Sequence, residues 1–218
     1  MPDLTQRDGL HVLDLGADEN RFSPDWLDAV NDALDKVVAE PAPLITVGSG
    51  KFYSNGLDLD WLSANPTELT PYTARIEALF ARVLTLPVPT IAAVNGHAFG
   101  GGAMFAIAHD WRVMREDRGY FCFPEVDIHI PFTVGMSALI QSKLTPREAT
   151  ASMTTGRRFG GPDAVLGGLV DTTASETELL DLATSMVAPL SGKDPQTLGT
   201  IKTTMYAGAV RALTEAGA

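Results

Sequence analysis

The sequence feature that most constrains the fold is a run of three glycines, Gly100 to Gly102, in the stretch NGHAFGGGAMF. The run separates an apolar segment expected to be a strand, TIAAVNG, from a segment expected to be a helix. Glycine costs about 1 kcal/mol per residue against alanine in a helix, so helix stability does not explain it. The absence of a Cβ atom instead permits a tight turn, or the close approach of another group to the backbone.

A second glycine turn has the same form. The stretch SGKFYSNGLDLDWL, residues 49–62, follows an apolar run, turns at Asn55 and Gly56, and passes into a helix-like segment from Leu57. The first N–H groups of a helix lack acceptors within the helix and lie at the positive end of its dipole. Two such donors, one from each turn, would stabilise negative charge on a single oxygen atom. For either turn alone, a purely structural role is the alternative.

The order of the expected elements indicates an α/β domain. Strands are predicted at 11–15, 43–50 and 90–96. They alternate with amphipathic helices, the first of which begins with the Ser23 cap and Pro24. A further strand pair is predicted at WRVM and YFCF, and the pattern is helical after Pro131. Such alternation is typical of mostly parallel strands.

This pattern contains no internal repeat or long linker. We therefore expect one domain, with its core in residues 1–171 and a short helical C-terminal region in residues 172–218. Two helical segments, broken near SGKDP, are predicted in the second part.

Composition excludes several classes of function. The formal net charge of −11 argues against non-specific nucleic-acid binding. The single cysteine, Cys122, excludes an intrachain disulfide and a multi-cysteine metal site, and it fits a reducing cytosol. We expect a cytoplasmic protein with no membrane segment, because the sequence has no signal-peptide pattern, no membrane-spanning apolar run and no C-terminal peroxisomal tripeptide.

The glycine stretches do not match three common motifs. GHAFGGG lacks the closing Gly-Lys-Ser/Thr of a phosphate-binding P-loop and the G-x-G-x-x-G spacing of a dinucleotide site. The G-x-S-x-G turn of a serine hydrolase is absent from the sequence. No histidine lies in a pattern that suggests a metal, so we expect none.

Four stretches together resemble the crotonase superfamily, also called the enoyl-CoA hydratase/isomerase family: FYSNGLDL, IAAVNGHAFGGGAMFAIAHDWRVM, DRGYFCFPEVDIHIP and GRRFGGPDAVLGGLVD. They cover most of residues 10–171. The resemblance implies an α/β, crotonase-like spiral of ββα units and a homotrimer or dimer of trimers. It also implies acyl-CoA thioester substrates, with no cofactor apart from the CoA of the substrate. By position, the family's two oxyanion-hole donors fall on the backbone N–H groups of Leu57 and Gly101.

The proton carrier that the resemblance implies is Glu125, in FPEVDIHIP. Hydratases of the family use two glutamates, but the first position is occupied here by Met104, which cannot transfer protons. One carboxylate suits a double-bond shift, because a single base can remove a C2 proton from a 3-enoyl-CoA and return it to C4. HDWRVMREDRGYFCFPEVDI also resembles the Δ3,Δ2-enoyl-CoA isomerases of fatty acid β-oxidation, with His129 where that type usually has glycine.

Glu125 also has an ordinary interpretation, since a carboxylate at a strand end is usually solvated, as expected for Asp127. If Glu125 is the base, its apolar neighbours Phe123, Val126 and Ile128 are expected to raise its pKa by desolvation.

Six residues are predicted to bind the substrate: Lys51, Phe52, Asn55, Gly56, Gly100 and Met104. Lys51 and Phe52 precede the first turn, where this family commonly runs the adenine and pantetheine past the backbone. Met104 fits an acyl tunnel and core packing equally well. Lys202 and Arg211 are further candidates for a CoA phosphate, because some members reach it from the C-terminal helices.

Three functions remain open from the sequence. An isomerase is the leading hypothesis; another crotonase-type reaction, such as thioester hydrolysis or weak hydration by Glu125 alone, is the second. A non-catalytic acyl-CoA-binding subunit is the third. The C-terminal helical part is short for the family, so the closure of the acyl pocket and the chain length of the substrate stay open.

Overall fold

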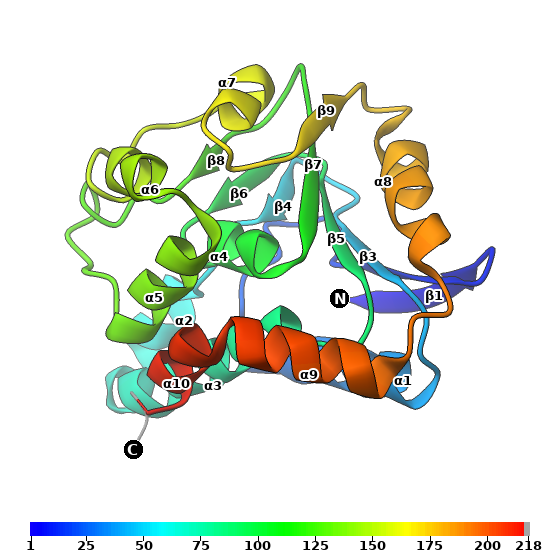
Figure 1. Cartoon of the computed structure of the whole chain (residues 1–218). Helices are drawn as coiled ribbons and strands as arrows, with labels where there is room; N and C mark the ends of the chain where they lie inside the picture. Colours follow the sequence, from blue (N-terminus) through cyan, green and yellow to red (C-terminus); the bar gives the residue numbers. More distant parts are fainter. Residues whose placement is uncertain (216–218) are drawn as a thin grey trace.

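A computed structural model describes residues 1–215, so the last three residues of the predicted C-terminal region, 216–218, lie outside the described residues. The chain winds repeatedly between strands and helices (Figure 1). The strands are β1 (Asp3–Arg7), β2 (Leu10–Asp14), β3 (Leu44–Val47), β4 (Phe52–Ser54), β5 (Thr90–Val94), β6 (His97–Phe99), β7 (Trp111–Arg115), β8 (Phe121–Cys122) and β9 (Thr172–Ala174). The helices are α1 (Pro24–Ala39), α2 (Leu59–Ala64), α3 (Leu69–Leu84), α4 (Gly101–Ala108), α5 (Val134–Lys143), α6 (Pro146–Met153), α7 (Gly161–Leu166), α8 (Leu179–Val187), α9 (Pro195–Met205) and α10 (Ala207–Glu215), with short 3-10 helices η1 (Pro66–Glu68) and η2 (Ala188–Leu190).

The strands form two sheets that the chain builds in alternation. The larger sheet has the order β1-β2-β3-β5-β7-β9, and the smaller one has the order β4-β6-β8. Strands β3, β5 and β7 of the larger sheet are each followed by a strand of the smaller sheet and then by a helix. All neighbouring strands are parallel except β1 and β2. The expected spiral of ββα units in an α/β fold is therefore confirmed.

Three details differ from the expectation. The edge strands β1 and β9 and the strands β4 and β6 were not predicted, because β1 is polar and largely exposed while β4, β6 and β9 are each three residues long. Periodicity is too weak a signal over so few residues. The predicted pair at WRVM and YFCF forms strands, β7 and β8, but these lie in different sheets and do not pair with each other. The helix expected from Leu57 begins at Leu59.

The core follows the alternation of side chains along the larger sheet. In β5, Ala92 and Val94 face the main core under α1, α3 and α4, whereas Ile91 and Ala93 face α8. Burial on both faces explains why β5 is apolar along its length, without a polar face. The predicted start of α1 is confirmed, since the Ser23 hydroxyl accepts a hydrogen bond from the N–H of Trp26.

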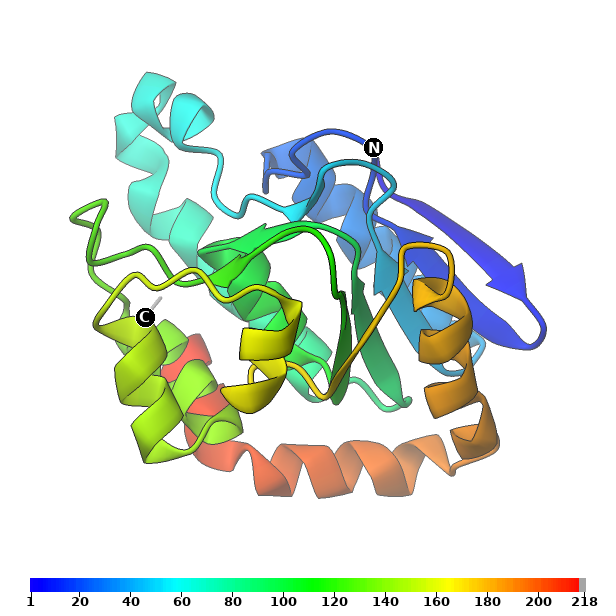
Figure 2. The same ribbon diagram turned by 90° about the horizontal axis from the view of Figure 1, so that it is seen from above.

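The C-terminal region wraps one edge of the molecule. Helix α9 runs along that edge (Figure 2), and α10 then packs against α3 and α5 of the same chain. The break expected near SGKDP is present between α8 and α9, and a second break at Tyr206 separates α9 from α10. Among residues 1–215, no helix combines the length and apolarity needed to span a membrane.

A buried ion pair fastens α9 to the core. The Nζ of Lys202, a residue that is 4% exposed, donates to Asp110 Oδ2 at 2.6 Å and to the carbonyl of Val88 at 2.7 Å. Lys202 is therefore not free to meet a CoA phosphate, contrary to the sequence-based suggestion. Arg211, the other candidate on this tail, is exposed on α10.

Replacing this buried cation tests the role of the pair. In Lys202→Met, the carboxylate of Asp110 keeps its burial and loses its counter-ion, so the free energy of unfolding should fall by about 3 kcal/mol. The control is Arg157→Ala, which breaks the half-exposed pair with Asp163 and should cost less than about 1 kcal/mol. Urea unfolding measures both. Equal losses in the two variants would contradict a structural role for the buried pair.

Candidate active site

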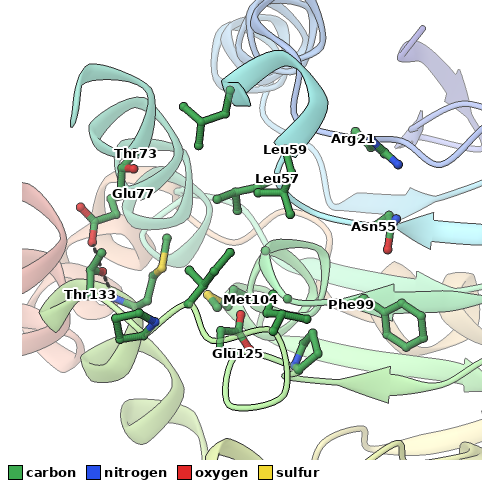
Figure 3. Close-up of a pocket in the computed structure, with 18 of the residues that line it drawn as sticks. Arg21, Asn55, Leu57, Leu59, Thr73, Glu77, Phe99, Met104, Glu125 and Thr133 are labelled. Carbon is green, nitrogen blue, oxygen red and sulfur yellow. Dashed lines mark hydrogen bonds between the residues drawn. The ribbon is translucent and has the colours of Figure 1, made fainter. Parts of the chain in front are cut away.

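A cavity of about 900 Å³ opens between the smaller sheet and helices α2, α3 and α5. Its wall is mainly apolar. Labelled side chains follow its length in Figure 3, with Arg21, Asn55 and Phe99 at one end, Leu57, Met104 and Glu125 in the middle, and Glu77 and Thr133 at the other end. The two glycine turns and the Pro-Glu pair, far apart in the sequence, thus meet around one space.

The two glycine turns touch each other through their backbones. A Cβ atom added to Gly56 would lie 2.7 Å from the nitrogen of Gly101 and 2.9 Å from that of Gly102. The φ of Gly56 is +76°, in the left-handed region that glycine tolerates. No other residue type fits this contact without moving the start of α4.

Within the described chain, two residues that line the cavity have backbone N–H groups without acceptors at this contact. The amides of Leu57 and Gly101 donate no hydrogen bond to any group within residues 1–215. Both residues line the cavity, and Gly101 is the first residue of α4. Unpaired amides can stabilise an oxygen that gains negative charge, and the amide of Gly101 also lies at the positive end of a helix dipole.

A different local constraint explains each glycine of the triple run. Gly100 has a φ of +50°, and its N–H donates to the carbonyl of Cys122 at 3.0 Å. Gly101 faces the side chain of Leu57, which a Cβ atom would approach to 2.9 Å. Gly102 packs on the backbone of Ser54, whose carbonyl oxygen a Cβ atom would approach to 2.1 Å. The glycines therefore bring α4 directly against β4 and the first turn.

Glu125 lies in the turn after β8, beside these amides. A Cβ atom on Gly100 would lie 3.3 Å from Glu125 Oε1, so the carboxyl group is close to the peptide that carries the Gly101 N–H. The residue is 7% exposed, and Oε2 has no hydrogen-bond partner in the part of the chain that the structure describes. Burial raises the pKa of Glu125 to about 7, while its own backbone N–H opposes the rise.

The pKa of Glu125 is raised by burial as expected, but only one of the three expected apolar neighbours is buried. Desolvation is the cause of the raised pKa, and Phe123 is buried as expected. Val126 and Ile128, however, are each about half exposed, at 48% and 47%. Ile128 lines the cavity, whereas Val126 does not. Asp127 is exposed, as the solvated interpretation predicts.

The backbone of the same turn explains the unusual histidine. Asp127 and Ile128 both donate from their N–H groups to the carbonyl of Pro124, and Ile130 donates to that of Glu125. His129 has a φ of +58°, a left-handed conformation that favours glycine. The turn thus keeps a glycine-like backbone at a position where the resembled isomerases usually have glycine.

The six predicted substrate-binding residues divide into two groups. Asn55, Gly100 and Met104 line the cavity. Lys51, Phe52 and Gly56 are not among its lining residues; Gly56 instead supports the amide of Gly101 from behind. The Nζ of Lys51 lies 5.3 Å from the ring of Phe52, which packs against the ring of His97.

Sequence reasoning missed two polar residues at the inner end of the cavity, Glu77 and Thr133. Glu77 lies between the buried residues Ile76 and Phe80 of α3, so its place on an apolar helix face was a signal that could have singled it out. Thr133 is the N-cap of α5, and nothing in the sequence ties it to Glu77. Within residues 1–215, no group of three or more His, Cys, Asp or Glu side chains is placed to hold a metal ion.

The raised pKa of Glu125 makes a prediction about stability. Because the folded chain holds the proton more tightly than the unfolded chain does, the stability from protonated Glu125 is present below about pH 4.5 and is lost as the pH rises through about 7. The stability of Glu125→Gln relative to the wild type should therefore increase by about 2 to 3 kcal/mol between about pH 5 and about pH 8. Urea unfolding of both proteins at both pH values measures this, and a pH-independent difference would refute the buried, protonated carboxyl.

Comparisons with known proteins show the family of the chain. The family model described as "Enoyl-CoA hydratase/isomerase" matches residues 9–218. "Enoyl-CoA delta isomerase 3" of Arabidopsis thaliana is 35% identical over 216 residues, which cover 93% of this chain and 91% of that protein. "Carnitinyl-CoA dehydratase" of Salmonella enteritidis is 31% identical over 159 residues, 73% of this chain and 60% of that one.

A solved structure shows the same fold at lower identity. Human mitochondrial delta3-delta2-enoyl-CoA isomerase is 19% identical and has a TM-score of 0.91, over 98% of this chain and 86% of that chain. The family match spans nearly the whole sequence, and the fold and the glycine turns fit it. The chain therefore belongs to the enoyl-CoA hydratase/isomerase family of enzymes, the crotonase superfamily that its motifs resemble.

Proposed function

We propose that the protein is an isomerase that shifts the double bond of a 3-enoyl-CoA to give the 2-enoyl-CoA. One observation carries this proposal: a single buried carboxyl group, Glu125, lies beside the unpaired amides of Leu57 and Gly101 on the wall of an apolar cavity. The similarity to an enoyl-CoA delta isomerase over more than nine tenths of both chains supports the same reaction.

In the proposed mechanism, the thioester oxygen accepts hydrogen bonds from the N–H groups of Leu57 and Gly101. These bonds stabilise the enolate that forms when Glu125 removes a proton from C2. The negative charge spreads over the existing double bond to give a dienolate. Protonated Glu125 then returns the proton to C4, which leaves the double bond between C2 and C3 and regenerates the carboxylate. No cofactor takes part.

The charge state of Glu125 suits both steps. A group that must first accept and then donate a proton works best when its pKa is near the working pH, and burial raises the pKa of Glu125 to about 7. The unpaired Oε2 atom leaves one oxygen of the carboxyl group open to the substrate.

Hydration or dehydration is the second candidate function, because a carnitinyl-CoA dehydratase is among the relatives. Addition of water to a 2-enoyl-CoA needs one group to activate the water and another to protonate C2. At the position where the resembled hydratases have their first glutamate, the cavity wall carries the thioether of Met104. This substitution favours the isomerase.

The CoA part of the substrate would leave the cavity at the end marked by Arg21 and Phe99 in Figure 3. Arg21 is already paired with Glu19 and Asp60, each at 2.6 Å. Arg158 lies over the ring of Phe99, with 5.6 Å from the guanidinium carbon to the ring centroid, and it has no ion-pair partner within residues 1–215. Arg158 is therefore the better candidate for a phosphate contact. The homotrimer and the cytoplasmic location stay predictions.

The central test replaces the proposed base. Incubation with 3-hexenoyl-CoA should yield the conjugated 2-enoyl-CoA. The ultraviolet absorbance of this product measures the rate. Glu125→Gln should lower kcat by about 10² to 10⁴, because it removes the proton carrier and keeps the size of the side chain. Asp127→Asn, in the same turn but exposed, is the control and should keep activity close to that of the wild type.

Other outcomes of that assay separate the remaining functions. Hydration of crotonyl-CoA without any isomerisation would favour the second candidate. Binding of both thioesters with turnover of neither would favour a non-catalytic acyl-CoA-binding subunit. Full isomerase activity in Glu125→Gln would refute the role of this residue.

A second test moves one of the two amides. In Gly56→Ala the added Cβ would lie 2.7 Å from the nitrogen of Gly101, so it should displace that N–H and lower kcat by about 10² to 10³. Gly9→Ala is a matched control, because Gly9 has nearly the same φ, +77°, and open space around its Cβ position. Comparable losses of kcat in the two variants would mean that backbone strain, rather than the amide position, is responsible.

A further inference from the structure

The inner end of the cavity carries a polar pair that the proposed reaction does not use. Glu77 of α3 lines the cavity and is 1% exposed. Figure 3 shows Glu77 and its partner Thr133 at the end of the cavity opposite Arg21, with Glu125 and Met104 between the two ends. The proton transfers occur at C2 and C4, beside Glu125, so the inner end faces carbons of the acyl chain that do not react.

Thr133 fixes one oxygen of this carboxyl group and leaves the other unpaired. The Thr133 hydroxyl accepts the N–H of Met136 at the start of α5, so its own hydrogen is directed to Glu77 Oε1, at 2.5 Å. Glu77 Oε2 makes no hydrogen bond to any group in residues 1–215. The carboxyl group is therefore oriented by the protein, and half of its hydrogen-bonding capacity is unused.

The protein packs tightly around the fixed side of this group. A Cβ atom on Gly135 would lie 2.5 Å from Glu77 Oε1, 2.8 Å from the Cα of Leu213 and 2.9 Å from the carbonyl of Ala212. Helix α10 thus packs behind Gly135 and the fixed oxygen of Glu77, and the carboxyl group cannot turn away from the cavity without disturbing α5 and α10.

The chemistry of the pair selects one class of ligand group. Burial raises the pKa of Glu77, and the hydrogen bond from Thr133 opposes this rise. Burial thus favours the neutral carboxylic acid, which both donates and accepts hydrogen bonds, as a hydroxyl group does. An alkyl end pressed against Oε2 would bury it without a partner, which is unfavourable.

We propose that Glu77, held by Thr133, is a specificity-determining residue that recognises a hydroxyl group on the acyl chain, remote from the thioester. The preferred substrates are then 3-enoyl-CoA thioesters that carry a hydroxyl near the far end of the chain. This inference rests on the proposed function for its kinetic test, but its binding test is independent of turnover.

The kinetic test uses pairs of 3-enoyl-CoA thioesters of increasing chain length, each made with a terminal methyl and with a terminal hydroxyl group. At the chain length that reaches Glu77, the wild type should favour the hydroxyl form in kcat/KM by about tenfold. Glu77→Met, which is apolar and of similar size, should abolish or reverse the preference. Glu77→Gln, which still donates and accepts, should retain most of it.

Thr73→Val is the position control, since Thr73 lines the same wall one helical turn before Glu77. Its preference ratio should equal that of the wild type. A wild-type ratio of one or less at every chain length would overturn the proposal, and so would an unchanged ratio in Glu77→Met. An equal loss of preference in Thr73→Val would overturn it as well, because the selectivity would then belong to the general polarity of the wall.

A binding measurement separates this inference from the proposed function. Calorimetry gives the Kd values of saturated acyl-CoA thioesters of the same chain lengths, again in pairs with a terminal methyl and a terminal hydroxyl group. A tighter Kd for the hydroxyl form in the wild type, lost in Glu77→Met, supports the inference even if no 3-enoyl-CoA is isomerised. Isomerisation of both forms at equal kcat/KM, with equal Kd values, would leave the isomerase standing and remove Glu77 from substrate recognition.

Discussion

The backbone contact between Gly56 and the start of α4 is the constraint on which the rest of the site depends. The first turn can approach the nitrogen of Gly101 only because Gly56 has no Cβ atom. The same contact leaves two amides unpaired on one wall, and it directs α4 against β4 through Gly102. Both sheets position this junction, because each turn follows one strand of the larger sheet and one strand of the smaller sheet.

Unpaired polar groups inside a protein are unfavourable for stability, and this site concentrates several of them. The amides of Leu57 and Gly101 and the carboxyl groups of Glu125 and Glu77 are each only partly satisfied within residues 1–215. Such groups are tolerated where the surrounding structure holds them. Strands β4, β6 and β8 and helix α4 surround the amides and Glu125, whereas Thr133 at the start of α5 holds Glu77. Under the proposed function, the oxygen of a bound thioester accepts hydrogen bonds from the two amides, and Glu125 exchanges a proton with the substrate.

Much of the fold could be predicted from the sequence, because its long elements carry strong signals. The Ser23-Pro24 start of α1 and the apolar strands at 44–47 and 90–94 follow from capping and burial patterns. The short strands β4 and β6 could not be predicted, because three residues give no periodicity. Both also lie directly next to the glycine turns, so the sequence does not separate strand from turn. What makes them strands is pairing with each other and with β8, which is a long-range property.

The candidate site shows the same division. Motifs led to Leu57, Gly101 and Glu125, but the reason for each glycine came only from the distances to Ser54 and Gly101 across the turn. Lys202 illustrates the limit of reading a charge from sequence, since its ammonium group is buried against Asp110. Glu77 shows the opposite limit, because its sequence position does not reveal that it lines the cavity. Only the contact between α3 and the start of α5 shows this.

The packing of α10 behind Gly135 has a consequence for how this scaffold can diversify. The C-terminal helix packs behind the end of the cavity that is remote from the glycine turns, and it contacts α3 and α5. Under the proposed function, substitutions in the tail would change the space for the acyl chain at that end and leave the geometry around the thioester intact. Chain-length selectivity and bond chemistry would then depend on separate stretches of the polypeptide, so either could change in evolution without the other.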